Sequence, residues 1–183
     1  MTLIKKIALC RHFPIPTISS WKFLSTNKFN DWIEKNKSVL PEETDSFSPL
    51  KAWDKCLSSD LPRAKKTASV LASNTIIEHT DILREVPFIP FSFPFILPFG
   101  AWLLLSRLRW LLIKNNKLET KQASLKRASI AIDLVFSQKE NNILVVSHGF
   151  FIHLLSKELK KRGFEGSHPT TPEYGVPYVF EKK

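Results

Sequence analysis

The sequence has little cysteine: Cys10 and Cys56 are the only two among its 183 residues. Two cysteines exclude a framework of several disulfides, and no cysteine–histidine spacing typical of a zinc site occurs. The first dozen residues also lack an apolar stretch of secretory length and a small-residue cleavage site. We therefore expect a cytoplasmic protein whose two thiols are small core residues in reducing surroundings.

Acidic residues are scarce as well, with 17 Asp and Glu against 27 Lys and Arg and a formal charge of +10. Such an excess favours anionic partners, such as phosphorylated metabolites, nucleic acid or an acidic membrane face. No aromatic-basic motif of a known nucleic-acid module is present, so no nucleic acid is expected. The chain also lacks internal repeats and low-complexity linkers. We expect residues 1–183 to form a single domain, since a chain of this length buries a sizeable core.

Two segments of the chain share one design. Four apolar residues, 7–10, lead into Arg11 and His12, and a similar run, 143–146, leads through Ser147 into His148. Strands that are apolar at consecutive positions suit a parallel sheet covered by helices on both faces. Ligands of such sheets bind at the carboxyl ends of the strands, where both histidines would arrive.

Helical patterns lie between and after these strands, at 60–74, 117–138 and 149–163. Residues 75–86 are typical of a short strand and turn, and the tail at 176–183 is expected to be an edge strand. This alternation predicts an α/β fold, a three-layer sandwich with a mostly parallel central sheet and helices on both faces.

The helix expected at 60–74 begins with a second polar cluster, "SSDLPRAKKTA". Ser58, Ser59 and Asp60 are cap candidates, which would place Arg63 in the first turn. The free N–H groups and dipole of a helix N-terminus attract anions, and a guanidinium group there can hold two phosphate oxygens. Taken alone, an arginine in a first turn is more often a surface residue.

An apolar, proline-rich segment spans residues 86–113. Its first 21 residues, 86–106, carry no charge, a length that raises the question of a membrane span. A spanning helix does not tolerate prolines at this spacing, which stand at positions 87, 90, 94 and 98. A helix could follow Gly100, and we expect Arg107 and Arg109 to interrupt it early. The segment could serve as a lid, a homodimer contact or a membrane-surface contact.

Four motifs in order resemble the histidine phosphatase superfamily, the phosphoglycerate mutase-like group. These are Arg11-His12 after the first strand, "SSDLPRAKKTA" at 58–68, "LREV" at 83–86 and "VVSHG" at 145–149. The resemblance implies a phosphoglycerate mutase-like fold and a metal-independent phosphomonoester hydrolase that works through a phosphohistidine. Because this group lacks a metal, no cofactor is implied.

The resemblance also implies a role for each matched residue. His12 would be the nucleophile, neutral and held by a backbone carbonyl through its other ring nitrogen. Arg11 and Arg63 would bind the phosphate oxygens, joined by His148, which would be protonated. Glu85 would be the general acid that protonates the leaving group, with Asp81 as a rival for that role in the sequence.

One departure concerns the residue after the nucleophile, which is usually glycine in this family and is Phe13 here. Phe13 must point away from the phosphate or form one wall of the pocket. The chain also lacks the extra loops of the mutases, which favours a phosphatase. The apolar segment follows Glu85, where the family builds its substrate lid. We therefore expect the substrate to be a phosphorylated small molecule whose non-phosphate part is partly hydrophobic. The alternative is a catalytically silent scaffold that binds a phosphorylated partner or an anionic membrane surface.

Overall fold

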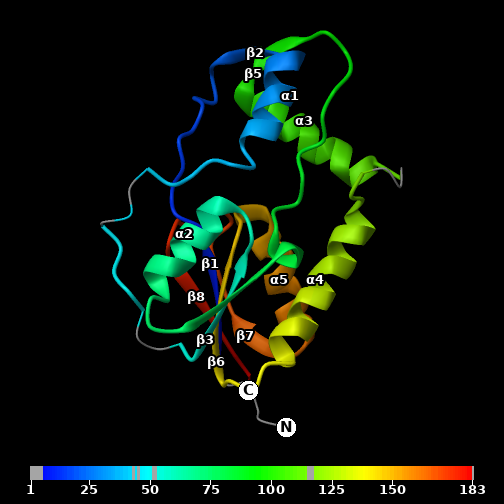
Figure 1. The fold of residues 1–183 in the computed structure, drawn as a ribbon. Coiled ribbons are helices and arrows are strands. Elements are labelled where there is room, and N and C mark those ends of the chain that lie inside the picture. The colour runs from blue at the N-terminus through cyan, green and yellow to red at the C-terminus, as the bar shows by residue number, and fades with distance from the viewer. Residues whose placement is uncertain (1–5, 43, 45, 51–52, 115–117, 183) are drawn as a thin grey trace.

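The computed structural model describes residues 6–42, 44, 46–50, 53–114 and 118–182. Its centre is a six-stranded sheet with the strand order β4-β3-β6-β1-β8-β7 (Figure 1). In that order, the strands are β4 (Ile76–Thr80), β3 (Lys55–Ser59), β6 (Asn142–Ser147), β1 (Lys6–Arg11), β8 (Pro177–Lys182) and β7 (Phe164–Gly166). The first four are parallel, and β8 and β7 are antiparallel to their neighbours. The predicted α/β fold with a mostly parallel sheet is confirmed.

Helices cover both faces of this sheet. Successive residues of a strand point to opposite faces, so neighbouring residues of β1 pack against different helices. Ile7 and Leu9 of β1 belong to one core cluster, with residues from α4 (Lys121–Phe136) and α5 (Gly149–Lys161). The residues between them, Ala8 and Cys10, join a second cluster with α2 (Pro62–Leu71). The continuous apolar runs of β1 and β6 therefore reflect burial on two sides.

A smaller unit stands above the carboxyl end of the sheet (Figure 1). It consists of β2 (Phe23–Ser25), α1 (Thr26–Lys35), β5 (Ile96–Pro98) and α3 (Phe99–Leu112), and is called the cover below. β2 and β5 pair antiparallel, and an aromatic core forms between α1 and α3, where the rings of Phe29 and Trp102 stack 5.2 Å apart. Within the described residues, no helix has the length and apolar character needed to cross a membrane.

Two details differ from the sequence prediction. The tail strand β8 is not at the edge: it lies between β1 and the three-residue strand β7, and its Phe180 is fully buried. Ser58 and Ser59 do not cap α2, because they belong to β3 and the N-cap residue is Leu61. Pro62 opens that helix, a position at which its missing N–H costs nothing. The helix expected from 117 begins at Lys121 after the cap Thr120, and position 117 lies outside the described residues.

The helix α3 runs through Arg107 and Arg109 to Leu112, so the expected interruption was wrong. Arg107 donates to the carbonyl of Val86 at 2.9 Å and Arg109 to that of Pro90 at 2.6 Å. A segment rich in proline has few N–H donors and leaves many carbonyls to other partners. The two arginines thus join the proline-rich segment to α3.

Candidate active site

The two histidines that end the apolar strands lie next to each other. Parallel pairing sets Arg11 opposite Ser147, so that His12 and His148 leave the same edge of the sheet. Their ring centroids are 5.1 Å apart, with 5% of His12 and none of His148 exposed. The structure therefore brings together two imidazoles from segments 136 positions apart in the chain.

The hydrogen bonds of His12 define its protonation state. Nδ1 lies 2.6 Å from the carbonyl oxygen of Phe13, which only accepts, so Nδ1 carries the proton. Nε2 accepts from Nε of Arg63 at 3.2 Å and therefore presents a lone pair. Burial, reinforced by the charge of Arg63, lowers the pKa of His12 to about 3. The ring is neutral at physiological pH, the state a nucleophilic imidazole needs.

Arg63 reaches this ring from the first turn of α2. Only 4% of its surface is exposed, and its Nη1 donates to the carbonyl of Asn36 at 2.6 Å. Thr67, one turn later, accepts from the backbone N–H of Phe13 and donates to the carbonyl of Arg63. The helix α2 is thereby fastened to the residue that follows the candidate nucleophile.

Arg11 lies on the other side of the site, above the start of α5. Nη1 donates to the carbonyl of Pro172 at 3.0 Å and Nη2 to the hydroxyl of Tyr174 at 2.7 Å, with the guanidinium over the tyrosine ring. A Cβ at Gly149 would lie 3.2 Å from Nε of Arg11, so this glycine allows the close approach. Among the described residues, Nε has no hydrogen-bond partner although it is buried.

His148 is the second group here with a buried and unpaired nitrogen. Its Nε2 lies 2.9 Å from the hydroxyl of Ser59, while Nδ1 has no partner among the residues described. Burial, followed by the proximity of His12 and Arg63, lowers the pKa of His148 well below its ordinary value. Burial beside cations therefore favours a neutral His148 in the site without phosphate, while the protonated His148 expected with phosphate bound stays a prediction.

Glu85 is fixed against the N-terminus of α5. Its carboxylate accepts from the backbone N–H groups of Phe150 at 3.1 Å and Phe151 at 3.0 Å. A carboxylate at this end of a helix meets free N–H groups and the positive end of the dipole. Asp81, the rival in the sequence, is exposed at the start of the 3-10 turn η1 (Asp81–Leu83).

These side chains surround a cavity of about 190 Å³. The sheet side supplies the polar groups, which are Arg11, His12, Arg63, Glu85 and Tyr174. The opposite wall is mostly apolar and comes from the cover and the loops beside it, with Ile15, Ile18, Trp32, Phe88, Phe99 and Leu103. Asp81 and the fully buried His148 are not among its lining residues.

Phe13 points into the core and does not line the cavity. It is fully buried, packs in the cluster under α2 and stacks on Phe47 with ring centroids 4.0 Å apart. Gly175 makes room for this pair: it has φ +72°, and a Cβ there would lie 2.4 Å from Phe47. The departure from the usual glycine is therefore accommodated by the core, and Phe13 is not among the residues that line the cavity.

Sequence reasoning missed several residues that complete the site. Tyr174 holds Arg11, the carbonyl of Asn36 holds Arg63, and the hydroxyl of Ser59 contacts His148. Tyr174 lies in the loop "HPTTPEYGVP", where an aromatic residue between proline and glycine is a weak signal of a fixed turn. A backbone carbonyl such as that of Asn36 leaves no signal in a sequence.

Comparisons with known proteins agree with this fold. The family model of the histidine phosphatase superfamily (branch 1) matches residues 45–173. That range contains Arg63, Glu85 and His148 but not Arg11 and His12, which enter the site through the geometry described above. A comparison with curated protein sequences gave no match.

Solved structures of the same fold align over nearly the whole chain. The product of an open reading frame of Mycobacterium tuberculosis has a TM-score of 0.57 at 16% identity, over 96% of this chain and 90% of that one. A mutant phosphoserine phosphatase from Entamoeba histolytica, bound to phosphoserine, has a TM-score of 0.53 at 16% identity, over 96% of both chains. A mycobacterial glucosyl-3-phosphoglycerate phosphatase reaches 0.50 at 18%, over 86% and 82%.

The fold and its neighbours define the class as a phosphoglycerate mutase-like α/β protein. Within that class, the match over 45–173 covers most of the chain. The chain belongs to the histidine phosphatase superfamily, which supports a phosphatase-type enzyme.

Proposed function

We propose that this protein is a phosphomonoester hydrolase that forms a phosphohistidine on His12 without a metal ion. The observation that carries the proposal is the state of that ring: it is neutral, with the proton on Nδ1 and a lone pair on Nε2 that accepts from Arg63, and both residues line the cavity. An imidazole in this form attacks phosphorus without first losing a proton. The positive charge that a metal would supply comes from Arg11 and Arg63.

The reaction has two balanced steps. In the first, Nε2 of His12 forms a bond to phosphorus while the ester P–O bond breaks, and Glu85, which must be in its protonated form when substrate binds, gives its proton to the leaving oxygen. In the second, Glu85 takes a proton from water, whose oxygen bonds to phosphorus as the P–N bond breaks. Nδ1–H stays bonded to the Phe13 carbonyl in both steps, which stabilises the imidazolium-like phosphohistidine.

The phosphate oxygens would be held by donors that are unpaired or can be released. Nε of Arg11 and Nδ1 of His148 are buried without partners among the described residues, and such groups call for an acceptor. Arg63 now donates to the lone pair of His12, so its guanidinium must turn to a phosphate oxygen before attack. A phosphate dianion would also favour protonation of His148, which would then act as a third donor.

The substrate proposed is a phosphorylated small molecule with a partly hydrophobic remainder. Arg11 and Arg63 are the cations that line the described cavity, and one phosphate dianion satisfies both. The wall beyond them is apolar and aromatic, and burying apolar surface there favours such a remainder. The phosphoserine phosphatase and the glucosyl-3-phosphoglycerate phosphatase named above have substrates with an amino acid or a sugar portion, so this wall would distinguish the present chain.

The test is hydrolysis of 4-nitrophenyl phosphate in the presence of a chelator. We expect turnover by the wild type and inhibition by vanadate, with a loss of roughly 10⁴-fold or more in His12→Ala. His79→Ala is the matched control, because His79 lies on β4 outside the cavity. An acid-labile phosphoryl group trapped on the wild type and absent from His12→Ala would identify the nucleophile.

Glu85→Gln tests the general acid separately. We expect a loss of roughly 10²–10⁴-fold with an alkyl phosphate, whose leaving oxygen needs a proton. With 4-nitrophenyl phosphate, the first step should be much less affected, because nitrophenolate leaves without protonation. Equal losses of that first step with both substrates would contradict the assignment.

The rival is the silent scaffold, which the Arg63–His12 hydrogen bond favours because it occupies the lone pair. If neither wild type nor His12→Ala turns over and phosphate still raises the melting temperature, the protein binds phosphate without hydrolysis.

The cytoplasmic location also stays a proposal. It is supported by free, buried Cys10 and Cys56, and burial raises the pKa of Cys56 to about 12.

A further inference from the structure

The helix α3 is apolar on two sides. One side faces the protein interior through Phe99, Trp102, Ser106 and Trp110. The other consists of five leucines, called the leucine face here, whose exposed fractions are 61% for Leu104, 38% for Leu105, 46% for Leu108, 48% for Leu111 and 78% for Leu112. Their spacing places them along one side of the helix. A helix that is apolar all round is normally covered on all sides.

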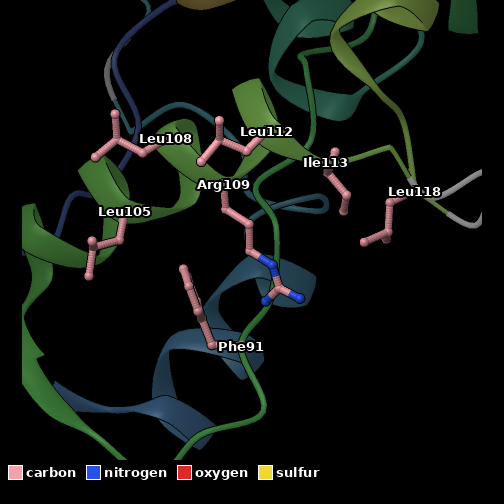
Figure 2. A pocket seen from close by; sticks show the side chains of 7 residues that line it. All are labelled: Phe91, Leu105, Leu108, Arg109, Leu112, Ile113 and Leu118. Atoms are coloured by element: carbon pink, nitrogen blue, oxygen red, sulfur yellow. The ribbon is translucent and has the colours of Figure 1, made fainter.

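A groove beside the leucine face enlarges the apolar surface. It has a volume of about 520 Å³, and Figure 2 shows Leu105, Leu108 and Leu112 above it with Phe91 on the other side. Ile113, the first residue after α3, and Leu118 also line this groove. Of the described residues that line this groove, Arg109 is the one that carries a charge. The leucine face and the groove together therefore form an apolar surface, with the cation Arg109 at its edge.

The charged residues of the segment that carries this surface have one sign. Residues 86–118 contain no Asp or Glu, and the first acid that follows, Glu119, is paired with Arg127 at 2.8 Å. Lys114 and Lys121 line a second hollow together with Leu111 and Leu112. Apolar side chains in the middle and lysine or arginine at the rim match a lipid surface with anionic headgroups.

We propose that the leucine face docks on an anionic lipid bilayer. The helix would lie in the plane of the interface, its leucines at the acyl boundary and Arg109, Lys114 and Lys121 at the headgroups. A second copy of this chain is the less suitable occupant. A twofold contact through this face would bring the same cations together without an acidic partner on the 86–118 segment. Anionic lipids neutralise those charges.

The experiment is co-sedimentation with vesicles of phosphatidylcholine alone and of phosphatidylcholine with phosphatidylglycerol in equal parts. We expect the wild type to bind the mixed vesicles, and Leu108→Ser and Leu112→Ser each to weaken binding about tenfold. Lys121→Gln should weaken it about fivefold on mixed vesicles, with no change on phosphatidylcholine. Leu125→Ser on α4 is the matched control, since Leu125 is also exposed, at 41%, but lies on another helix.

Three outcomes would overturn the proposal: no binding of the wild type to mixed vesicles, equal losses in Leu112→Ser and Leu125→Ser, or a dimer in sedimentation velocity that Leu112→Ser dissociates. Thermal unfolding of each variant checks that it is folded. Leu108 and Leu112 do not line the catalytic cavity, so hydrolysis of 4-nitrophenyl phosphate in solution should be unchanged in these variants. The same assay keeps a failure of docking distinct from a failure of the proposed hydrolase.

Discussion

The sheet side and the cover form opposite walls of one cavity, and the two walls consist of different kinds of side chain. The sheet side brings the charged groups, each held by named hydrogen bonds: Arg11 by Pro172 and Tyr174, and Arg63 by Asn36. The cover holds itself together through stacked aromatic rings and offers an apolar wall. Preorganised donors suit a fixed group such as phosphate, whereas an apolar wall can change shape without loss of charge compensation. In the proposed hydrolase, chemistry and substrate selectivity would therefore reside in separate parts of the molecule.

The largest difference between the two regions should appear in stability. Phe13→Ala in the sheet core should lower the free energy of unfolding by about 3–5 kcal/mol, because it removes a fully buried ring stacked on Phe47. Phe93→Ala beside the cover should cost less than about 0.5 kcal/mol, since 67% of Phe93 is exposed. Urea denaturation of both variants measures the difference, and similar costs would break the comparison.

The next effect concerns the charges on the sheet side. Arg63→Gln should lower kcat/KM for 4-nitrophenyl phosphate by roughly 10²–10³-fold, because it removes a fixed donor to the phosphate. Arg84→Gln is the matched control: Arg84 is a neighbour in the fold but pairs with Asp60 outside the cavity. A loss of the same size in Arg84→Gln would mean that Arg63 acts through the fold and not through the phosphate.

A smaller effect is the pH dependence of stability. The unfolded His12 takes up a proton near its ordinary pKa of 6.5, whereas the folded one does so only at about 3. Between these values the unfolded state binds more protons, so stability falls as pH falls, by up to about 1.4 kcal/mol per pH unit. The pKa of His148 is lowered in the same direction, while the cover contains no histidine.

His12→Asn should therefore make the fall between pH 6 and pH 4 shallower while the Asn amide still reaches the Phe13 carbonyl. Urea denaturation at each pH measures this slope. An unchanged slope in the variant would show that His12 takes up its proton in the folded state as easily as in the unfolded one.

The smallest effect concerns the apolar wall. Leu103→Ala should lower the preference for naphthyl phosphate over methyl phosphate, as a ratio of kcat/KM, by about tenfold. Leu104→Ala is the matched control, because the next residue on α3 points outward and does not line the cavity. If Leu103→Ala leaves this preference unchanged, the cover does not take part in substrate selection.

The parts of the fold that local patterns specify were predictable. β1, β6 and α5 follow from consecutive apolar residues and from helical spacing, and Arg63 lies in the first turn of α2 as expected, although the cap is Leu61 and not one of the expected residues. The cover was not, because β2 and β5 pair across more than 70 positions and no local pattern marks such a contact. The full burial of His148 was not predictable for a related reason, since burial is set by the whole fold.

The position of β1 in the sheet bears on how the protein is made. This strand leaves the ribosome well before its two neighbours, β6 and β8, which lie more than 130 positions later in the chain. Pairings so distant in sequence form late. A nascent chain that stops before residue 172 lacks the carbonyl and the ring that hold Arg11, so Arg11 cannot be fixed in its place until the segment 172–174 has been made.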